Sequence, residues 1–470
     1  MISNPSSSMI GPSAPNQGIS ASGAIESASA VADESAFIGM RSGTESAPSP
    51  SSAMNVFEKK PDRSSRQVRA IKSVKQNYYE PSEEILSLLE TFRMMTNACI
   101  RIGLANDVST LRKLSHLCYK ELSRYNVISY YKLHAISRAA GILASRKKSI
   151  RRGIPTRDPY AVSPQLVSCY GFKLERGVLG IPLGERKYFD VPLNKHTQEL
   201  LLSEPGVEVR SFTLTPSTVS LTISREAEEI SCVNMGGLDR NLRNLTYGNE
   251  ERVVQYELSK AVKIAETTKE VVGSFRRDDV RIRKRIASKY GRRRKNRIMH
   301  LLHCATKQVV EEAFRSRETI ALEDIKGIRR LYARGNGQGG GFRGRMNSWS
   351  FGEAQRQVEY KAKWRGVTVI HLTKDETRGT TRECARCRER LQVAQRDDVR
   401  HRRQLWCPRC KRWVDRDVNA VMNQSRRGRL RFDRSLPHDE AKGEAGEAMK
   451  GNPTTPVILR VGCLEDDSQR

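Results

Sequence analysis

Hydrophobic positions in the first half of the chain follow a strand period, then a helical period, then a strand period again. The strand-like patterns lie at the start of 66–81 and over 160–226. The helical patterns lie between them, at roughly 82–104, 108–124 and 128–149. We therefore expect a β domain made of 66–81 and 152–230, interrupted by a helical insert over 82–151.

Two apolar stripes at helical spacing predict that this insert is a small bundle. The stripes comprise Leu111, Leu114, Leu117, Cys118 and Leu122 in one helix, and Leu133, Ile136, Ala140 and Leu143 in the next. Such stripes usually form a core, so we do not interpret them as a ligand site.

A third block, from residue 232 onwards, alternates strands and helices. We expect strands at 233–238, 244–247, 253–258, 319–322 and 367–372, long helices up to about 315, a glycine-rich loop at 335–344 and a helix at about 348–365. A strand, a helix and a strand in succession predict a parallel pair with a right-handed crossover. The fold class is therefore multidomain α+β, with an α/β domain over 232–380 and 411–435.

The two ends of the chain differ from these blocks. Residues 1–65 are rich in Ser, Ala, Gly and Pro, a composition that predicts a disordered leader. Residues 436–470 form a tail to which we assign no role. The sequence has neither a run of about 18 apolar residues nor a secretory signal, so we expect a cytoplasmic protein without a membrane partner.

The net charge of the chain limits the classes of partner that the protein is expected to bind. The 470 residues include 83 Lys and Arg against 53 Asp and Glu, a formal net charge of +30 that favours polyanions such as nucleic acid. Twelve Lys or Arg and two Asp lie between Arg276 and Arg297. We expect salt-sensitive contacts with phosphates, independent of base sequence, from Arg276, Arg277, Arg281, Arg283, Lys284, Arg285, Arg292, Arg293, Arg294 and Lys295. Tyr290 and Phe342 are candidates to stack on unpaired bases.

Four of the ten cysteines have the spacing of a metal site. Cys384 and Cys387 form one Cys-x-x-Cys pair, Cys407 and Cys410 form another, and 19 residues separate the pairs. This pattern predicts a zinc ribbon over 381–410, with four thiolates closing a structural Zn²⁺ site. The other six cysteines are scattered singly, as is usual for thiols in a reducing compartment.

Three acids in the third block lie at the ends of expected elements. Asp239 and Glu323 each follow an apolar strand, and Asp417 precedes an apolar helix. Carboxylates that converge in this way can hold Mg²⁺ ions for phosphodiester hydrolysis. Neighbouring acids that could also touch metal, or have a supporting role, are Asp324, Asp375 and Asp415.

At this point the sequence resembles the TnpB family, whose members are encoded by insertion sequences and are similar to type V CRISPR effectors. The resemblance covers roughly residues 66–430. It rests on Gly237-Leu238-Asp239, Leu322-Glu323-Asp324, Asn347-Ser348-Trp349-Ser350-Phe351, Thr377-Arg378-Gly379-Thr380 and Asp415-Arg416-Asp417-Val418-Asn419-Ala420. The sequence departs from the family at Arg240-Asn241, and at Arg388 and Lys411, where Gly is common.

The resemblance implies an RNase H-like RuvC nuclease domain interrupted by a zinc-binding module for target nucleic acid, after a β-barrel wedge domain with a helical recognition insert. It also implies that Asp239, Glu323 and Asp417 are catalytic Mg²⁺ ligands, and that the four paired cysteines bind zinc. The implied partners are a guide RNA and target DNA, in a prokaryotic cytoplasm.

The sequence favours an RNA-guided, Mg²⁺-dependent DNA endonuclease encoded by a transposable element. Two alternatives from other classes stay open: an RNA-guided DNA-binding regulator without cleavage, and an RNA-independent transposition accessory protein. The oligomeric state stays open as well.

Overall fold

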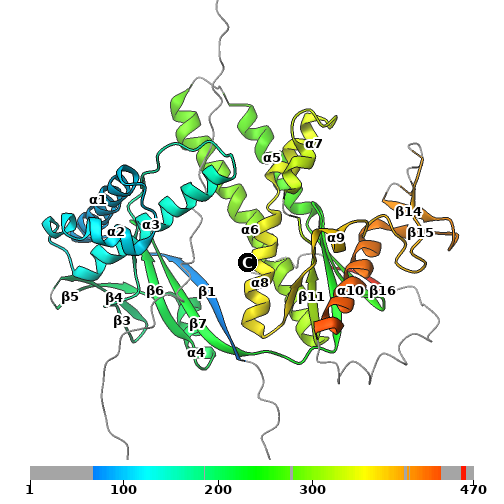
Figure 1. The fold of residues 1–470 in the computed structure, drawn as a ribbon, viewed down its shortest axis with the longest axis horizontal. Helices are drawn as coiled ribbons and strands as arrows, with labels where there is room; N and C mark the ends of the chain where they lie inside the picture. Colours follow the sequence, from blue (N-terminus) through cyan, green and yellow to red (C-terminus); the bar gives the residue numbers. More distant parts are fainter. Residues whose placement is uncertain are drawn as a thin grey trace, which may run out of the picture. The chain divides into compact units, whose positions relative to one another are not determined.

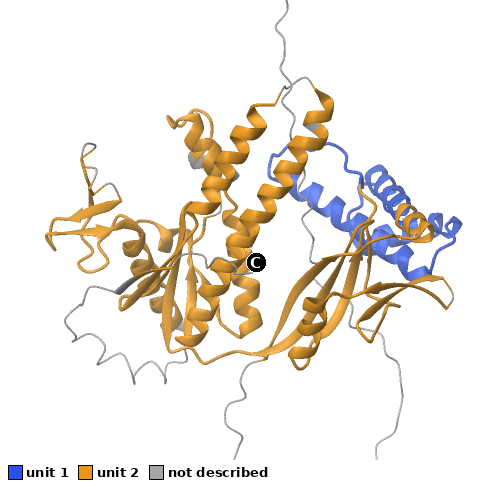
Figure 2. Cartoon of the chain, turned by 180° about the vertical axis from the view of Figure 1, so that it is seen from behind, with its two compact units in different colours: residues 1–56, 91–162 blue, residues 57–90, 163–470 orange. Residues whose placement is uncertain are grey.

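We describe the protein from a computed structural model. The described residues are 67–184, 186–275, 279–325, 327–395, 398, 400–401, 403–435 and 457–461. The predicted leader, Arg276, Arg277 and most of the predicted tail lie outside these ranges. The chain divides into two compact units, of which the first comprises residues 91–162 of the described chain and the second the remainder (Figure 2).

The first unit is helical. It contains most of α1 (Glu83–Ala105), then α2 (Leu111–Cys118), a 3₁₀ turn (Glu121–Arg124) and α3 (Ser129–Arg151). The predicted stripes are confirmed at the buried positions Leu114, Cys118, Leu122, Ile136, Ala140 and Leu143. They are wrong at the exposed residues Leu111, Leu117 and Leu133. The short helix α2 buries a narrow strip around Leu114, and at about 100° per residue Leu111 and Leu117 lie on either side of that strip.

The second unit begins with two antiparallel sheets. One has the order β1 (Gln67–Asn77), β7 (Thr218–Glu228), β6 (Glu208–Leu214) and β2 (Leu166–Ser168). The other has the order β3 (Lys173–Glu175), β4 (Val178–Gly184) and β5 (Lys187–Pro192), followed in the chain by α4 (Lys195–Ser203). Strand β1 pairs with β7 along its whole length, so the chain before and after the helical unit belongs to one sheet.

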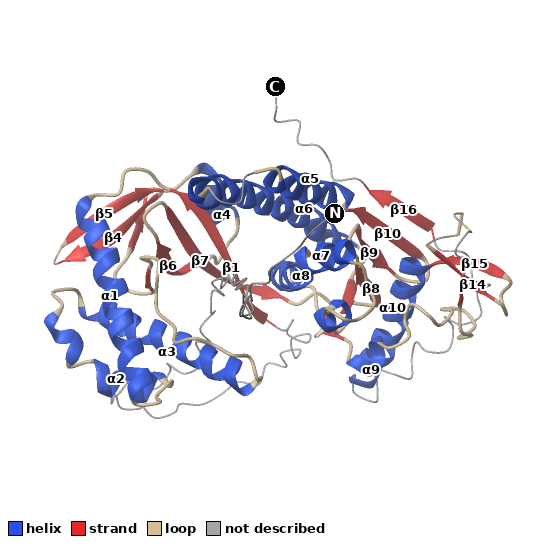
Figure 3. Cartoon of the chain, turned by 90° about the horizontal axis from the view of Figure 1, so that it is seen from above, coloured by secondary structure: helices blue, strands red, loops and turns tan. Residues whose placement is uncertain are grey.

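A six-stranded sheet forms the centre of the rest of this unit. Its order is β12 (Val369–His371), β11 (Glu318–Leu322), β8 (Asn234–Arg240), β9 (Asn244–Gly248), β10 (Arg252–Glu257) and β16 (Val457–Val461). Figure 3 shows β8, β9, β10 and β16 in this order. Strands β8, β9 and β10 are antiparallel, whereas β11 is parallel to both β8 and β12. This confirms the parallel pair predicted around helix α8 (Phe351–Arg365).

Helices pack on both faces of this sheet (Figure 1). On one face Leu238 and Leu322 join a core with residues of α8, α6 (Ser288–Arg315) and α5 (Ser259–Gly273). On the other face, Val253 packs against α10 (Arg416–Ser435). No helix in the described part of the chain is long and apolar enough to span a membrane.

Two segments differ from the prediction. Residues 340–344 were expected in a loop but belong to helix α7 (Gly340–Ser348), whose Phe342 ring meets Tyr332 edge-on at 6.5 Å. This helix starts after Gly339, whose carbonyl accepts a 3.1 Å hydrogen bond from the Arg343 amide. In the tail, β16 extends the central sheet by pairing parallel to β10.

Candidate functional site

Strand register brings the first two predicted acids together. In the parallel pair β8 and β11, Leu238 lies opposite Leu322, so Asp239 and Glu323 follow at the same edge of the sheet. Side chains alternate along a strand, so Leu238 faces the core of α6 and α8, whereas Gly237 and Asp239 face α10. The sheet alone thus places two carboxylates side by side.

Helix α10 brings the third acid. It approaches β8 so closely that a Cβ at Gly237 would lie 2.3 Å from the Val421 carbonyl oxygen. This contact explains why glycine precedes Leu238-Asp239. Asp417 lies in the first turn of α10 and, like Asp239, is buried, whereas Glu323 is 15% exposed.

The three carboxylates interact electrostatically. Burial, followed by the negative charges of Glu323 and Asp417, raises the pKa of Asp239 well above its ordinary value. Burial also raises the pKa of Glu323, opposed by the adjacent Arg240 guanidinium. A buried group of repelling carboxylates offers the oxygen ligands that Mg²⁺ prefers, and a cation there would relieve the repulsion.

Four further residues hold these acids, and sequence reasoning did not assign them this role. Asn241 Nδ2 donates a 2.8 Å hydrogen bond to Asp239 Oδ2. Arg240, with a fully buried side chain, donates a 2.8 Å hydrogen bond to the Glu323 carbonyl oxygen. Arg403, from the segment between the cysteine pairs, donates to the Asp417 carboxylate. Asn244 donates to the same carboxylate at 3.4 Å. The signal in the sequence was the pair Arg240-Asn241, which departs from the family pattern.

Asp415 has a structural role. Its Oδ1 accepts hydrogen bonds from the amides of Asp417 at 2.9 Å and Val418 at 3.1 Å. These contacts satisfy free amides in the first turn of α10, which is what an N-cap carboxylate does. Asp415 therefore orients Asp417 through the helix start.

The four paired cysteines form a tight cluster, the one such group of metal-ligand type found in the described residues, with ligand atoms all within 4.8 Å of one another. The Sγ atoms of Cys387 and Cys407 are 3.4 Å apart, and those of Cys384 and Cys410 are 3.9 Å apart. Tetrahedral zinc with Zn–S bonds of about 2.3 Å requires S–S distances of about 3.8 Å. The cluster can therefore hold zinc, whereas the three carboxylates are more widely spaced.

Two tight turns shape this cluster. The Cys410 amide donates to Cys407 Sγ at 3.3 Å, and the Arg388 amide donates to the Cys384 carbonyl at 2.9 Å. Arg388 and Lys411 have φ of +62° and +49°. These are the two positions where the family often has Gly. Both residues therefore have a backbone conformation that favours glycine. Strands β13 (Gln392–Val393), β14 (Gln404–Cys407) and β15 (Arg412–Asp415) complete the module.

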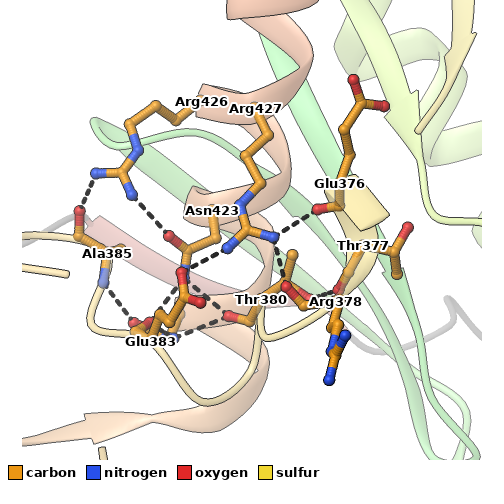
Figure 4. A network of polar contacts seen from close by, with 10 residues as sticks. Glu376, Thr377, Arg378, Thr380, Glu383, Ala385, Asn423, Arg426 and Arg427 are labelled. Atoms are coloured by element: carbon orange, nitrogen blue, oxygen red, sulfur yellow. Dashed lines mark hydrogen bonds and ion pairs between the residues drawn. The ribbon is translucent and has the colours of Figure 1, made fainter. Parts of the chain in front are cut away.

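Side chains of helix α10 form hydrogen bonds with the backbone around the first cysteine pair (Figure 4). Arg427 donates to the carbonyls of Glu376, in α9 (Lys374–Thr377), and Arg378, and to the carboxylate of Glu383. Arg426 donates to the Ala385 carbonyl at 2.6 Å. The helix that begins next to Asp417 therefore also fixes the segment that leads into the cysteine cluster.

The predicted basic residues lie partly on α6. Arg281 is exposed, Lys284 and Arg285 lie in a π-helical turn (Ile282–Ala287) before α6, and Arg292, Arg293, Arg294 and Lys295 lie in the first turns of α6. A cavity of about 530 Å³ is lined by Lys284, Arg285, Lys289, Arg292, Arg293 and Asn296. The backbone of Arg283 belongs to the π-helical turn, and Arg276 and Arg277 lie outside the described residues.

Comparisons with known proteins agree with this arrangement. The family model "Cas12f1-like, TNB domain" matches residues 351–424, which include α8 and the cysteine cluster. The TnpB-like protein MJ0751 of Methanocaldococcus jannaschii is 29% identical over 202 residues, which are 40% of this chain and 66% of that protein. The cryo-EM structure of a Cas12f1–sgRNA–target DNA complex matches with a TM-score of 0.52 and 12% identity, over 73% of this chain and 83% of that chain.

The fold therefore identifies the class of protein: it is a multidomain α+β protein whose fold is similar to that of Cas12f1. Within that class, the chain is similar to a TnpB-like protein and to Cas12f1, which confirms the resemblance to the TnpB family found in the sequence.

Proposed function

We propose that this protein is an RNA-guided, Mg²⁺-dependent DNA endonuclease of the TnpB type, encoded by a transposable element, with a single RuvC-like site. The observation that carries the proposal is the convergence of Asp239, Glu323 and Asp417 from β8, the end of β11 and the start of α10. The similarity to a TnpB-like protein and to Cas12f1 supports a nuclease as the general class.

The domain assignment belongs to the same proposal. A central sheet of three antiparallel strands extended by two parallel ones supports an RNase H-like domain over 232–380 and 411–435. The cysteine cluster supports a zinc ribbon over 381–410. The sheets around β1 and β7 support a wedge-like β domain over 66–81 and 152–230, and the helices support a recognition insert over 82–151.

The residues of the site have separate tasks in this proposal. Asp239, Glu323 and Asp417 would hold Mg²⁺, which when bound stabilises charge on the attacking and leaving oxygens of a phosphodiester. Arg240 fixes Glu323 through its carbonyl, and Asp415 fixes Asp417 through its amide. The Arg403 side chain is 51% exposed. Its guanidinium can therefore release the Asp417 carboxylate and contact a phosphate instead.

Guide RNA and target DNA are the proposed partners. The matched Cas12f1 structure contains both kinds of molecule, and the net charge of +30 supports binding of nucleic acid by this chain. In this reading, base pairing with the guide selects the target, and the protein contacts mainly backbone.

The test uses the full chain expressed with its native flanking DNA, from which co-purifying RNA is sequenced after a high-salt wash. A plasmid that matches the variable end of that RNA is then the substrate, with Mg²⁺ or with EDTA. We expect cleavage only with Mg²⁺. Removing a residue that supports a metal ligand usually costs about 10- to 100-fold, so losing a ligand in Asp239→Asn or Asp417→Asn should cost at least that much.

The matched control is Asp190→Asn, which removes an exposed carboxylate of β5 that is not among the acids considered for the site, and this variant should cleave normally. Guided binding without cleavage by the wild-type protein would instead support the regulator. Sequence-specific binding to element ends after RNase treatment, with no discrete co-purifying RNA, would support the accessory protein.

A further inference from the structure

We infer that a crevice between α5 and α6 binds one unstacked base of a single-stranded RNA segment. This inference rests on the proposed RNA binding and makes it specific to a site. The two helices run side by side (Figure 3) and enclose a cavity of about 150 Å³. The cavity lies apart from the three carboxylates and the cysteine cluster.

The lining of this cavity has two chemically different parts. Ile264 and Val271 of α5 and the ring of Tyr290 of α6 supply apolar and aromatic surface. Tyr290 is half-buried, and its ring meets Phe275 edge-on with centroids 5.8 Å apart, a contact that restricts its motion. A fixed aromatic ring over an apolar floor suits a flat heterocycle.

Arginines surround this apolar part. Arg293, Arg294 and Arg297 line the same cavity, and within the described ranges none of the three makes an ion pair. The larger basic cavity continues from Arg293 along α6. Arginines without an ion pair in the described chain, next to an aromatic floor, fit a base inside the cavity and its backbone phosphates on the arginines.

Size limits the occupant. Pockets for drug-sized ligands are usually about 300–1,000 Å³, so 150 Å³ is too small for a whole nucleotide but suits its base. A base within a duplex is not available to enter. The crevice therefore selects single strands over duplexes.

One hydroxyl favours RNA over DNA. Thr268 lines the cavity, and its Oγ1 donates a 2.7 Å hydrogen bond to the Ile264 carbonyl. Because this hydroxyl is used as a donor, it offers a lone pair to an incoming donor. Thr268 is half-buried, so the ribose of a nucleotide whose base fills the cavity can donate its 2′-OH to this hydroxyl from the mouth, and deoxyribose lacks that donor.

The test measures binding of fluorescent 12-nucleotide oligouridine, its deoxy counterpart and a 12-base-pair RNA duplex to the full-length zinc-loaded protein over a range of salt concentrations. Tyr290→Leu should weaken oligouridine binding by about 5- to 100-fold, because it removes one stacked base, and should leave duplex binding and the salt slope unchanged. Tyr290→Phe keeps the ring and should bind normally. Arg293→Gln should instead lower the salt slope for every probe.

Three results would overturn the inference: equal binding of oligouridine by Tyr290→Leu and wild type, equal losses for the single strand and the duplex, or a deoxy probe bound as tightly as RNA with the same dependence on Tyr290. A wild-type protein that binds no RNA probe and co-purifies with no RNA would contradict the proposed function itself. Normal RNA binding by the wild type and an unaffected Tyr290→Leu variant would refute only the binding site in the crevice and leave the proposed function intact.

Discussion

Replacing Asn419 with alanine should destabilise the cysteine module, which comprises the four paired cysteines and β13–β15, by a predictable free energy. Asn419 is fully buried in α10 and makes three hydrogen bonds to the segment that leads into the first cysteine pair. Its Oδ1 accepts from the Ala385 amide at 2.9 Å, and its Nδ2 donates to the carbonyls of Thr380 at 3.1 Å and Glu383 at 2.7 Å. It lies two residues after Asp417.

The free-energy cost of each substitution depends on which buried partners lose all their hydrogen bonds. Asn423 Nδ2 donates to the same two carbonyls, each at 2.8 Å, so both oxygens keep a donor after Asn419→Ala. The Ala385 amide loses its side-chain acceptor, and a buried unsatisfied donor costs about 1–3 kcal/mol. Asn423→Ala leaves that amide satisfied and should cost less, about 1 kcal/mol.

The assay is the rate at which the full chain releases zinc to an excess of chelator. If the segment around Ala385 must open for release, about 2 kcal/mol corresponds to roughly 30-fold faster loss for Asn419→Ala, and about 1 kcal/mol to roughly fivefold for Asn423→Ala. The double variant should exceed the sum of the single free-energy changes, because both carbonyls then lose every donor. Equal effects of the two single variants, or strict additivity, would refute this reasoning.

Three further predictions concern other contacts. Gly237→Ala should lower the melting temperature and cost at least about 2 kcal/mol, because its Cβ would clash with the backbone of α10, whereas Gly344→Ala has open space and should not destabilise the protein. Arg388→Gly and Lys411→Gly should each slow zinc release two- to fivefold, because φ is positive at both positions. Deleting 457–470 should speed amide exchange in β10, whereas deleting only 462–470 should not, because β16 pairs with β10.

The sequence predicted those parts of the site that depend on local pattern. The strand before Asp239, the strand before Glu323 and the helix start at Asp417 each carry a visible apolar period, and the cysteines carry a spacing. The contact of Arg403 with Asp417 had no such signal. It depends on how a hairpin between the cysteine pairs folds back on α10, and no periodicity records such a tertiary contact.

The same limit explains the misplaced elements. The glycines at 340–344 favour a loop by propensity, but propensity is a weak determinant that tertiary packing overrides, as the Tyr332–Phe342 contact in α7 illustrates. The strand β16 is only five residues long and follows a polar stretch, so its pattern alone is weak. Its partner, the free edge of β10, becomes evident only when the sheet is assembled.

Helix α10 links the two candidate metal sites through rigid, short-range contacts. Asp417 lies in its first turn, and Asn419, Asn423 and Arg427 grip the segment that leads into the cysteine cluster. From the opposite direction, Arg403 of the cysteine module contacts Asp417. Because both connections involve α10, a displaced cysteine module would also displace Asp417. Under the proposed function, the cysteine site would then influence phosphodiester hydrolysis only by positioning this acid.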